Sequence, residues 1–412
     1  MFIRIFANAI FFGGLLLFAT HLQAASTNTI TQTCTVNGVQ VDCATGQPLN
    51  PSAPPRSLFC PERVYEVIYG RYCDHRSSKL EYHAVKIMQA YGGGGFDLGT
   101  GLKAAYGMND NTDIVGTAVN SSGEVHAVKV QIGASYYSDH YFQDLGEPGV
   151  KSEARAINNI MTIVGASQIQ AGSRKYYETI WHSQVGFNYP LYTLGTNGGV
   201  AVDLARNRMY TEYVTGYSTL ADKTIHGFVW SFDGQQQTVD EIGEPGQDTY
   251  AIAINDSKVV VGYVRRSRYT FDPFVWRNGT MTLIPDFPYR SVAQAINNNA
   301  SPKVLGRARN LASGGYDVFV WQDSNTTVLP VLEGQNYNLA NAISDGGDIV
   351  GESGESAVIW RDNVIYDLNT LLDAPLGTNL NNAIDINRQG RILVRADDGF
   401  YYLLVPTEDL VQ

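Results

Sequence analysis

The sequence predicts an all-β fold, most simply a β-propeller of seven four-stranded blades. All five tryptophans end one short phrase, TIW, FVW or VIW, at Trp181, Trp230, Trp276, Trp321 and Trp360. Their intervals of 49, 46, 45 and 39 residues fall in the range of repeat architectures. Glycine (41) and tyrosine (25) are abundant and long charged runs are absent, which favours many short strands joined by tight turns.

Each repeat holds four phrases in a fixed order. The aromatic phrase comes first, and its tryptophan position is taken elsewhere by Ile87, Val130 and Tyr402. The second phrase is Asp-Leu-Gly or a variant, at residues 97–99, 144–146, 193–195, 241–243 and 367–369. The third is Ala-Ile-Asn or a variant, ending at Asn109, Asn158, Asn207, Asn255, Asn297, Ser344 and Asn387. The fourth is Ile-Val-Gly or a variant, ending at Gly116, Gly165, Gly216, Gly262, Gly306, Gly351 and, without the glycine, Val394.

These phrases predict the strands of one antiparallel unit of about 45 residues. The aromatic phrase alternates apolar residues, as a half-buried strand does. The asparagine can close an Asx-turn with its own side chain, so the third and fourth phrases form a hairpin. The glycine marks a bend or a close approach of backbones.

Seven asparagine turns but eight aromatic strands leave the start of each blade open. Blades that start at Asp-Leu-Gly leave a surplus strand at residues 83–87, whereas blades that start at the aromatic strand leave the C-terminal strand over. An open solenoid or irregular array is the alternative fold. A closed ring is favoured because it leaves no sheet face or long edge exposed at the ends.

The chain divides into four parts. Residues 1–24 are predicted to be a signal peptide, with Arg4, an apolar stretch and a small-residue cleavage site, rather than a membrane anchor. Residues 25–82 form a cysteine-containing segment, residues 83–406 the propeller, and residues 407–412 a tail. Cleavage removes Arg4, so the net charge falls from −11 to −12. We expect a soluble exported protein, periplasmic or extracellular, with no membrane span and no nucleic-acid partner.

The four cysteines, Cys34, Cys43, Cys60 and Cys73, all precede the repeats. An even count in an exported protein predicts disulfides, and four cysteines allow three connectivities. The favoured pairs are Cys34–Cys43 and Cys60–Cys73. Asn37-Gly38 predicts a hairpin turn inside the first pair. A simple two-residue turn would put Cys34 opposite Val41, so this bridge needs a bulge or a looser loop. A zinc site is disfavoured by the spacing.

From about residue 80 to residue 406 the chain resembles the bacterial HAF-type extracellular repeat proteins, a secreted family of largely unknown function. The resemblance is carried by His83-Ala84-Val85, His126-Ala127-Val128 and His226-Gly227-Phe228-Val229-Trp230, followed by the phrases above in order. The final unit, with Asp367-Leu368-Asn369 and residues 400–406, is the most similar. The third copy, around Asn207, and the sixth, at Ser344, depart from the pattern. The resemblance implies export and a repeat β fold, and it implies no catalytic residues.

No catalytic, cofactor or metal motif is found along the chain. His83, His126 and His226 recur at equivalent places, which favours packing beside the aromatic strand over metal ligation. Two acidic turns, residues 109–113 and 344–348, offer too few oxygens for calcium and coincide with the asparagine turns, where such residues are expected. We therefore predict no catalytic residue, no cofactor and no metal.

The loops after Ile-Val-Gly are basic in three repeats of an acidic chain. Loops of one type emerge on one side of a ring, so these charges should share a face. Arginine beside tyrosine suits carboxylates, sulfates and sugar rings, and an ordinary solvated loop is the alternative. The candidate ligand-binding residues are Arg174, Lys175, Tyr176, Arg265, Arg266, Arg268, Tyr269, Arg307 and Arg309.

The sequence as a whole predicts a secreted binding or interaction module that recognises an anionic glycan or an acidic protein through one loop face. Two other functions stay open. A polysaccharide-acting hydrolase or lyase would need carboxylates that converge in a central cleft. A structural component of the cell surface or matrix would assemble without a small ligand. The oligomeric state is left open.

Overall fold

The computed structural model describes residues 33–36, 39–42, 79–88, 101–133, 140–182, 187–191, 193–195, 197–206, 210–285, 287 and 290–411. Two compact units make up the chain, Met1–Ile68 and Tyr69–Gln412. Apart from two short 3-10 helices, η1 (Leu368–Leu371) and η2 (Thr407–Val411), every described element is a strand. The part of the chain described here contains no helix with the length and apolar character needed to cross a membrane.

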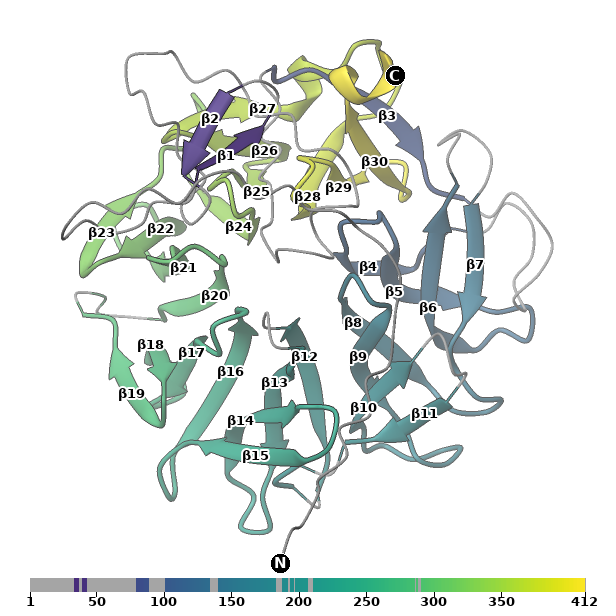
Figure 1. The fold of residues 1–412 in the computed structure, drawn as a ribbon, viewed down its shortest axis with the longest axis vertical. Helices are drawn as coiled ribbons and strands as arrows, with labels where there is room; N and C mark the ends of the chain where they lie inside the picture. Colours follow the sequence, from purple (N-terminus) through teal and green to yellow (C-terminus); the bar gives the residue numbers. More distant parts are fainter. Residues whose placement is uncertain are drawn as a thin grey trace, which may run out of the picture. The chain divides into compact units, whose positions relative to one another are not determined.

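The second unit contains seven four-stranded antiparallel sheets around a common centre, which confirms the predicted seven-bladed β-propeller (Figure 1). Sheet 1 consists of β4 (Ala104–Met108), β5 (Ile114–Val119), β6 (Val125–Ile132) and β7 (His140–Asp144). Sheet 2 consists of β8 (Ser152–Ile157), β9 (Thr162–Ser167), β10 (Tyr177–His182) and β11 (Phe187–Pro190). Sheet 3 consists of β12 (Gly199–Arg206), β13 (Glu212–Thr219), β14 (Ile225–Phe232) and β15 (Gln237–Ile242).

The remaining sheets continue around the ring. Sheet 4 consists of β16 (Asp248–Ile254), β17 (Val260–Arg265), β18 (Phe271–Arg277) and β19 (Thr280–Leu283). Sheet 5 consists of β20 (Val292–Ile296), β21 (Val304–Arg309), β22 (Tyr316–Gln322) and β23 (Asn325–Val328). Sheet 6 consists of β24 (Asn338–Ile343), β25 (Ile349–Ser353), β26 (Ser356–Arg361) and β27 (Val364–Asp367). Sheet 7 consists of β28 (Leu380–Ile386), β29 (Ile392–Ala396), β30 (Tyr401–Pro406) and β3 (Tyr82–Lys86).

The blades begin at neither of the two phrases expected from the sequence. The Ala-Ile-Asn strand comes first and lies nearest the centre, followed outward by the Ile-Val-Gly, aromatic and Asp-Leu-Gly strands (Figure 1). Both expected phases were therefore wrong, because the asparagine hairpin opens each sheet rather than lying in its middle or at its end. The hairpin itself is confirmed: β4 pairs antiparallel with β5, and β16 with β17.

The surplus aromatic strand closes the ring. β3 takes the outermost place in sheet 7, where an Asp-Leu-Gly strand lies in sheet 1, and pairs with β30 from Tyr82↔Pro406 to Lys86↔Tyr402. Ile87, which follows β3, is therefore not equivalent to the tryptophans, contrary to the prediction, whereas Val130 and Tyr402 do lie in third strands. A backbone ladder between the two ends of the repeat region thus replaces an exposed edge.

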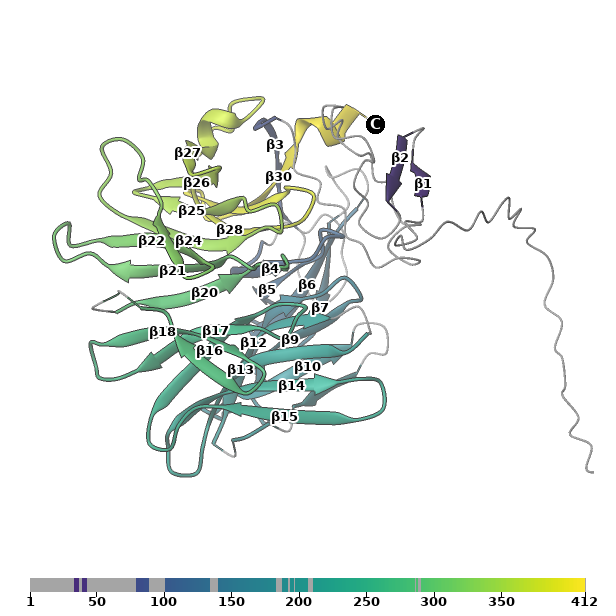
Figure 2. The same cartoon turned by 60° about the vertical axis from the view of Figure 1, so that its left-hand side comes forward.

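The core consists of apolar layers between neighbouring sheets, which lie face to face, as the β20–β22 and β16–β18 strands do in Figure 2. Trp360 is 1% exposed and packs against Leu305 and Leu329 of the preceding sheet. Its indole N–H donates to the carbonyl of Pro330 at 2.9 Å, and Trp181 makes the same kind of bond to Leu145 at 3.0 Å. Burying one such side chain contributes about 2–3 kcal/mol, so the tryptophan repeat marks inter-sheet packing.

Each innermost strand carries a bulge that explains the Ile-Val-Gly glycine. In sheet 1 the pairing skips Tyr106, between Ala105↔Gly116 and Gly107↔Val115. A Cβ on Gly116 would lie 2.0 Å from the carbonyl oxygen of Ala104, and Gly262 faces the same obstacle at Tyr250. The predicted close backbone approach is thus confirmed. Sheet 7 has valine at this place, and there β28 has a second register shift.

Two of the three repeated histidines pack as the sequence predicts, whereas His83 lies on the outermost strand β3, with its Nδ1 2.9 Å from Asp373. His126 is 2% exposed, and its Nδ1 lies 2.9 Å from the carboxylate of Asp144 on the neighbouring strand. His226 makes the equivalent contact with Glu241 at 2.5 Å. The histidine of the aromatic strand therefore binds the acidic residue of the Asp-Leu-Gly strand in the same sheet.

In the first unit, the structure describes a hairpin of β1 (Thr33–Val36) and β2 (Val39–Asp42). Cys34 pairs with Val41, the register expected of a simple two-residue turn. The side chain of Cys34, and all of Cys43, Cys60 and Cys73, lie outside the described residues, so the two disulfides stay a prediction. The signal peptide and the Asp97-Leu98-Gly99 phrase also lie outside them.

Candidate functional site

The asparagine turns cluster at one end of the ring, here called the Asn-turn end, and each asparagine uses both halves of its amide. Its Oδ1 closes its own turn: in Asn255 it accepts from the backbone N–H of Ser257 at 3.1 Å and of Val259 at 3.0 Å. Its Nδ2 donates to the next sheet, to the carbonyl of Asn297 at 3.0 Å. The turn prediction is therefore confirmed, and the bond to the next sheet is an additional role.

This inter-sheet bond recurs around the ring. It joins sheet 1 to 2, 4 to 5, 5 to 6 and 7 to 1, the last through Asn387 and the carbonyl of Asn109 at 3.3 Å. The residue after each asparagine adds a second bond, as where the N–H of Asp256 donates to Oδ1 of Asn298 at 2.8 Å. Asn207 lies outside the described residues.

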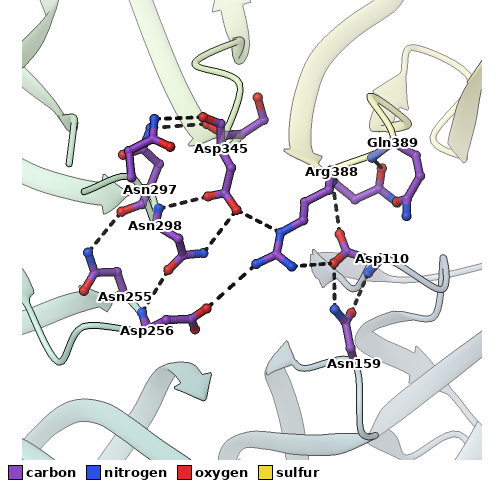
Figure 3. Close-up of polar contacts among 12 residues, drawn as sticks. Asp110, Asn159, Asn255, Asp256, Asn297, Asn298, Asp345, Arg388 and Gln389 are labelled. Carbon is purple, nitrogen blue, oxygen red and sulfur yellow. Dashed lines mark hydrogen bonds and ion pairs between the residues drawn. The ribbon is translucent and has the colours of Figure 1, made fainter. Parts of the chain in front are cut away.

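Arg388 lies at the centre of the Asn-turn end and contacts carboxylates from three sheets (Figure 3). Its Nε donates to Asp345 at 2.8 Å, its Nη1 lies 3.5 Å from Asp110, and its Nη2 lies 3.8 Å from Asp256. Arg388 belongs to sheet 7 and Asp256 to sheet 4, so the side chain reaches across the ring. Only 14% of it is exposed.

These residues line a cavity of about 260 Å³ at the centre of the ring, together with apolar side chains such as Leu204 and Ile386. Converging carboxylates in a central cleft are what a polysaccharide-acting enzyme would need. Here, however, they converge on a guanidinium, which holds them as ion pairs. The wall of this cavity is therefore ion-paired.

Two further carboxyls lie inside the ring wall. Oδ2 of Asp385 accepts from the N–H of Met108 at 2.8 Å, across the seam between sheets 7 and 1. Oδ2 of Asp203 accepts from the N–H of Ile254 at 2.9 Å, across the seam between sheets 3 and 4. Burial raises the pKa of Asp385 to about 7 and that of Asp203 to about 6, although these backbone bonds oppose the rise.

The acidic turns considered for calcium are engaged in protein contacts. Asp113 accepts from Nδ2 of Asn109 at 3.1 Å, and Asp348 accepts from Nε of Arg361 at 3.0 Å. Within the described part of the chain, no group of three or more acidic, histidine or cysteine side chains is arranged to hold a metal ion.

The nine predicted ligand-binding residues lie at the opposite end of the ring, here called the loop end, on three sheets. Arg174, Lys175 and Tyr176 precede β10 of sheet 2, where Lys175 donates to Asn197 at 3.2 Å. The other six follow or lie on strands of the neighbouring sheets 4 and 5. The clusters of sheets 4 and 5 therefore lie on neighbouring sheets, whereas the cluster of sheet 2 is separated from them by sheet 3.

The predicted arginines differ in how they are neutralised. Arg266 donates to Asp272 at 2.8 Å, and Nη1 of Arg265 lies 3.7 Å from Asp248. Arg307 and Arg309, by contrast, lie over the ring of Tyr316, at 5.4 and 5.2 Å from its centre.

The same arrangement recurs on sheet 4. Arg268 and Arg290 lie 5.5 and 4.9 Å from the ring centre of Tyr269, which is 55% exposed. β20 starts with Val292 opposite Arg307, so the chain passes Arg290 just before it reaches the strand beside Arg307. We call these six residues the Arg–Tyr patch: Arg268, Tyr269, Arg290, Arg307, Arg309 and Tyr316.

None of the four patch arginines forms an ion pair with a described residue, unlike Arg265 and Arg266. Cation–π contacts hold a guanidinium in place while leaving its N–H donors available. Arg290 and Tyr316 were missed from the sequence because neither belongs to a basic run. The strand register that sets Arg290 beside sheet 5 is not visible in the sequence.

A second set of tyrosines lies toward the centre at the loop end. The rings of Tyr217 and Tyr250 meet edge to face at 5.0 Å, and Tyr250 stacks on Tyr263 at 4.8 Å. Burial raises the pKa of Tyr263 to about 12. On sheets 2 and 1, the guanidinium of Arg155 lies 4.5 Å from the ring centre of Tyr106. We call Tyr106, Tyr217, Tyr250 and Tyr263 the aromatic row.

Residues of the aromatic row recur at fixed positions of the sequence repeat. Tyr217 and Tyr263 directly follow the glycine of Ile-Val-Gly, and Arg307 and Glu352 take the same place in sheets 5 and 6. Tyr106 and Arg155 are the residues that the inner-strand bulges leave unpaired. A comparison of repeats at these positions would have found the row.

No protein-family model matches the chain, and no curated protein sequence matches it. Among solved structures, the β-propeller domain of the Trilobed protease from Pyrococcus furiosus, described as revealing an open velcro topology, is 12% identical with a TM-score of 0.47. The match covers 73% of this chain and 94% of that domain.

Two whole peptidases are also similar. An acylaminoacyl peptidase from Pyrococcus horikoshii is 13% identical over 71% of this chain, with a TM-score of 0.46. A prolyl endopeptidase is 11% identical over 74% of this chain, with a TM-score of 0.48. The match spans about half of each peptidase, 49% and 50%. At these identities the likeness concerns the fold alone.

Proposed function

We propose that this β-propeller is an exported binding module whose Arg–Tyr patch holds the acidic groups of an anionic glycan. The observation that carries the proposal is the contrast between arginines at the loop end. Four of them, Arg268, Arg290, Arg307 and Arg309, lie on tyrosine rings without an ion pair to a described residue. In an acidic chain, four such cations on two neighbouring sheets form a site for carboxylate or sulfate groups.

The aromatic partners support a glycan. Tyr269 and Tyr316 offer rigid apolar surface beside the guanidinium groups, and a sugar ring has an apolar face of matching size. Export is part of the proposal and rests on the predicted signal peptide at residues 1–24. The resemblance to the HAF-type extracellular repeat proteins agrees with it, and membership of that family is likewise our proposal.

The test uses two double variants with the same loss of charge. Arg307→Ser/Arg309→Ser removes half of the patch guanidinium groups, whereas Arg265→Ser/Arg266→Ser removes two arginines that have carboxylate partners. Binding of hyaluronan is measured by calorimetry at low and high salt. We expect the patch variant to lose at least about tenfold in affinity and the control less than about threefold.

Wild-type binding should also weaken as salt rises, because exposed charges are screened. If both double variants weaken binding equally, net charge rather than the patch determines affinity. If the wild-type protein binds neither carboxylated nor sulfated glycans, the proposed function is wrong.

A further inference from the structure

The aromatic row continues from the Arg–Tyr patch across the loop end of the ring. Arg307 on β21 and Tyr263 on β17 hold the same repeat position on the second strands of neighbouring sheets, and Tyr263 stacks on Tyr250. Tyr250 meets Tyr217 across the seam between sheets 4 and 3. The row and the patch are therefore one continuous surface rather than two separate sites.

The surface extends further through sheets 2 and 1. Arg155 is on β8 of sheet 2, which packs beside sheet 3 with Tyr217, and its guanidinium lies over the ring of Tyr106 in sheet 1. The whole surface thus runs over five neighbouring sheets, from β4 to β22, along one side of the ring. Its members are partly exposed, so they present ring edges and polar groups to a ligand.

Charge changes along this surface. The patch end carries four arginines that form no ion pair with a described residue. At the far end, Arg155 donates to Glu153 from Nε at 2.9 Å and from Nη2 at 2.7 Å, so this pair carries no net charge. Such a pair offers both donors and acceptors, which suits hydroxyl groups, and it offers no net attraction to a second acidic group.

We infer that the ligand is a linear polysaccharide in which acidic sugars are separated by neutral ones, an inference that rests on the proposed function. Its acidic groups lie on the Arg–Tyr patch and its neutral sugars lie along the aromatic row. An extended chain is needed because no single sugar can reach from Tyr316 on sheet 5 to Tyr106 on sheet 1. An acidic polypeptide suits the far end less well, because the neutral Arg155–Glu153 pair there offers no net attraction to further carboxylates.

The experiment measures affinity for hyaluronan fragments from a disaccharide to an octasaccharide, because glucuronate and a neutral sugar alternate in this polymer. Two variants alter the far end: Tyr217→Leu keeps apolar bulk, and Arg155→Gln removes the guanidinium at a partly exposed position. We expect each to weaken octasaccharide binding about tenfold while leaving disaccharide binding unchanged. The patch variant Arg307→Ser/Arg309→Ser weakens binding of both lengths.

Each negative result contradicts a different part of the proposal. If affinity does not rise with chain length, or if both far-end variants bind the octasaccharide as the wild type does, the extended site is wrong and the patch stands. If fully acidic oligogalacturonate or polyglutamate binds more tightly than hyaluronan, the mixed-polysaccharide ligand is wrong. If the patch variant binds normally, the proposed function itself fails. Unchanged circular dichroism and melting temperature show that the variants are folded.

Discussion

At the Asn-turn end, Arg388 contacts Asp110, Asp256 and Asp345, and each described asparagine amide donates to another residue's oxygen. At the loop end, four arginines lie on tyrosine rings and form no ion pair with a described residue. The same repeat builds both ends. Polar groups that find partners between sheets hold the ring together, whereas these guanidinium groups keep donors for the ligand that we propose. The repeated ring contacts and the proposed ligand contacts thus lie at opposite ends of the hairpins.

The first prediction concerns Asp385, whose pKa is raised by burial to about 7, from an unfolded value of about 3.9. The folded protein therefore binds the proton more tightly, and this stabilisation is full below about pH 4 and lost above about pH 7. It amounts to about 4 kcal/mol. The nearby carboxylates of Asp203 and Asp110 act in the same direction.

The measurement compares unfolding free energies by urea denaturation near pH 5 and about pH 8 for the wild type and Asp385→Asn. We expect the wild type to lose more stability as pH rises, because the amide variant has no proton to release. Equal pH dependence in the two proteins would show that Asp385 titrates normally and that the seam between sheets 7 and 1 is not proton-linked.

The second prediction concerns the central arginine. Arg388→Ala leaves three carboxylates facing one another in a largely buried position, which should cost about 3 kcal/mol of unfolding free energy. Arg277→Ala, at an exposed position on β18, is the matched control and should change stability by less than about 0.5 kcal/mol. A loss no larger than that of the control would mean that the ring closes without the Arg388 contacts.

The third prediction separates the two roles of the turn asparagine. Asn255→Asp keeps the acceptor that closes the turn but replaces the donor to Asn297 with a second acceptor. Asn255 is only 2% exposed, so we expect a loss of about 2 kcal/mol at neutral pH, measured by thermal denaturation. Asn336→Asp, in an exposed loop, should have little effect.

The fourth prediction is the opposite change in the sixth repeat, where an inter-sheet hydrogen bond is added rather than removed. Ser344 closes its turn through its hydroxyl, which accepts from the N–H of Asp348 at 3.1 Å, but it has no amide to donate onward. Ser344→Asn should add that bond to sheet 7 and stabilise by about 0.5–1 kcal/mol. If Asn255→Asp were neutral and Ser344→Asn destabilising, the inter-sheet role of the amide would be refuted.

Much of the fold could be predicted because packing recurs with the repeat. Asn255 and its equivalents in the turns gave the number of sheets, and Gly116 and its equivalents gave the close approach on the second strand. The start of each blade could not be predicted, since an antiparallel repeat reads the same wherever counting begins. Only the pairing of β3 with β30 fixes it, and that contact joins residues more than 300 positions apart.

The site was less predictable. Basic runs identified Arg268, Arg307 and Arg309, but they gave Arg265 and Arg266 equal weight because their partners, Asp248 and Asp272, are recognised only in space. Arg388 follows the last asparagine, where five other repeats have aspartate or asparagine and the third repeat has Arg208. This departure from the commoner residues was its only sequence signal. Departures from a repeat consensus are therefore better site markers than local charge.

The most direct test of the separation between the two ends measures two quantities on two variants. Unfolding free energy and affinity for the hyaluronan octasaccharide are determined for Arg388→Ala and for Arg307→Ser/Arg309→Ser. The account predicts that the first variant loses stability but, while folded, keeps its affinity, and that the second keeps its stability but loses at least about tenfold in affinity. A loss of both properties in both variants would contradict it.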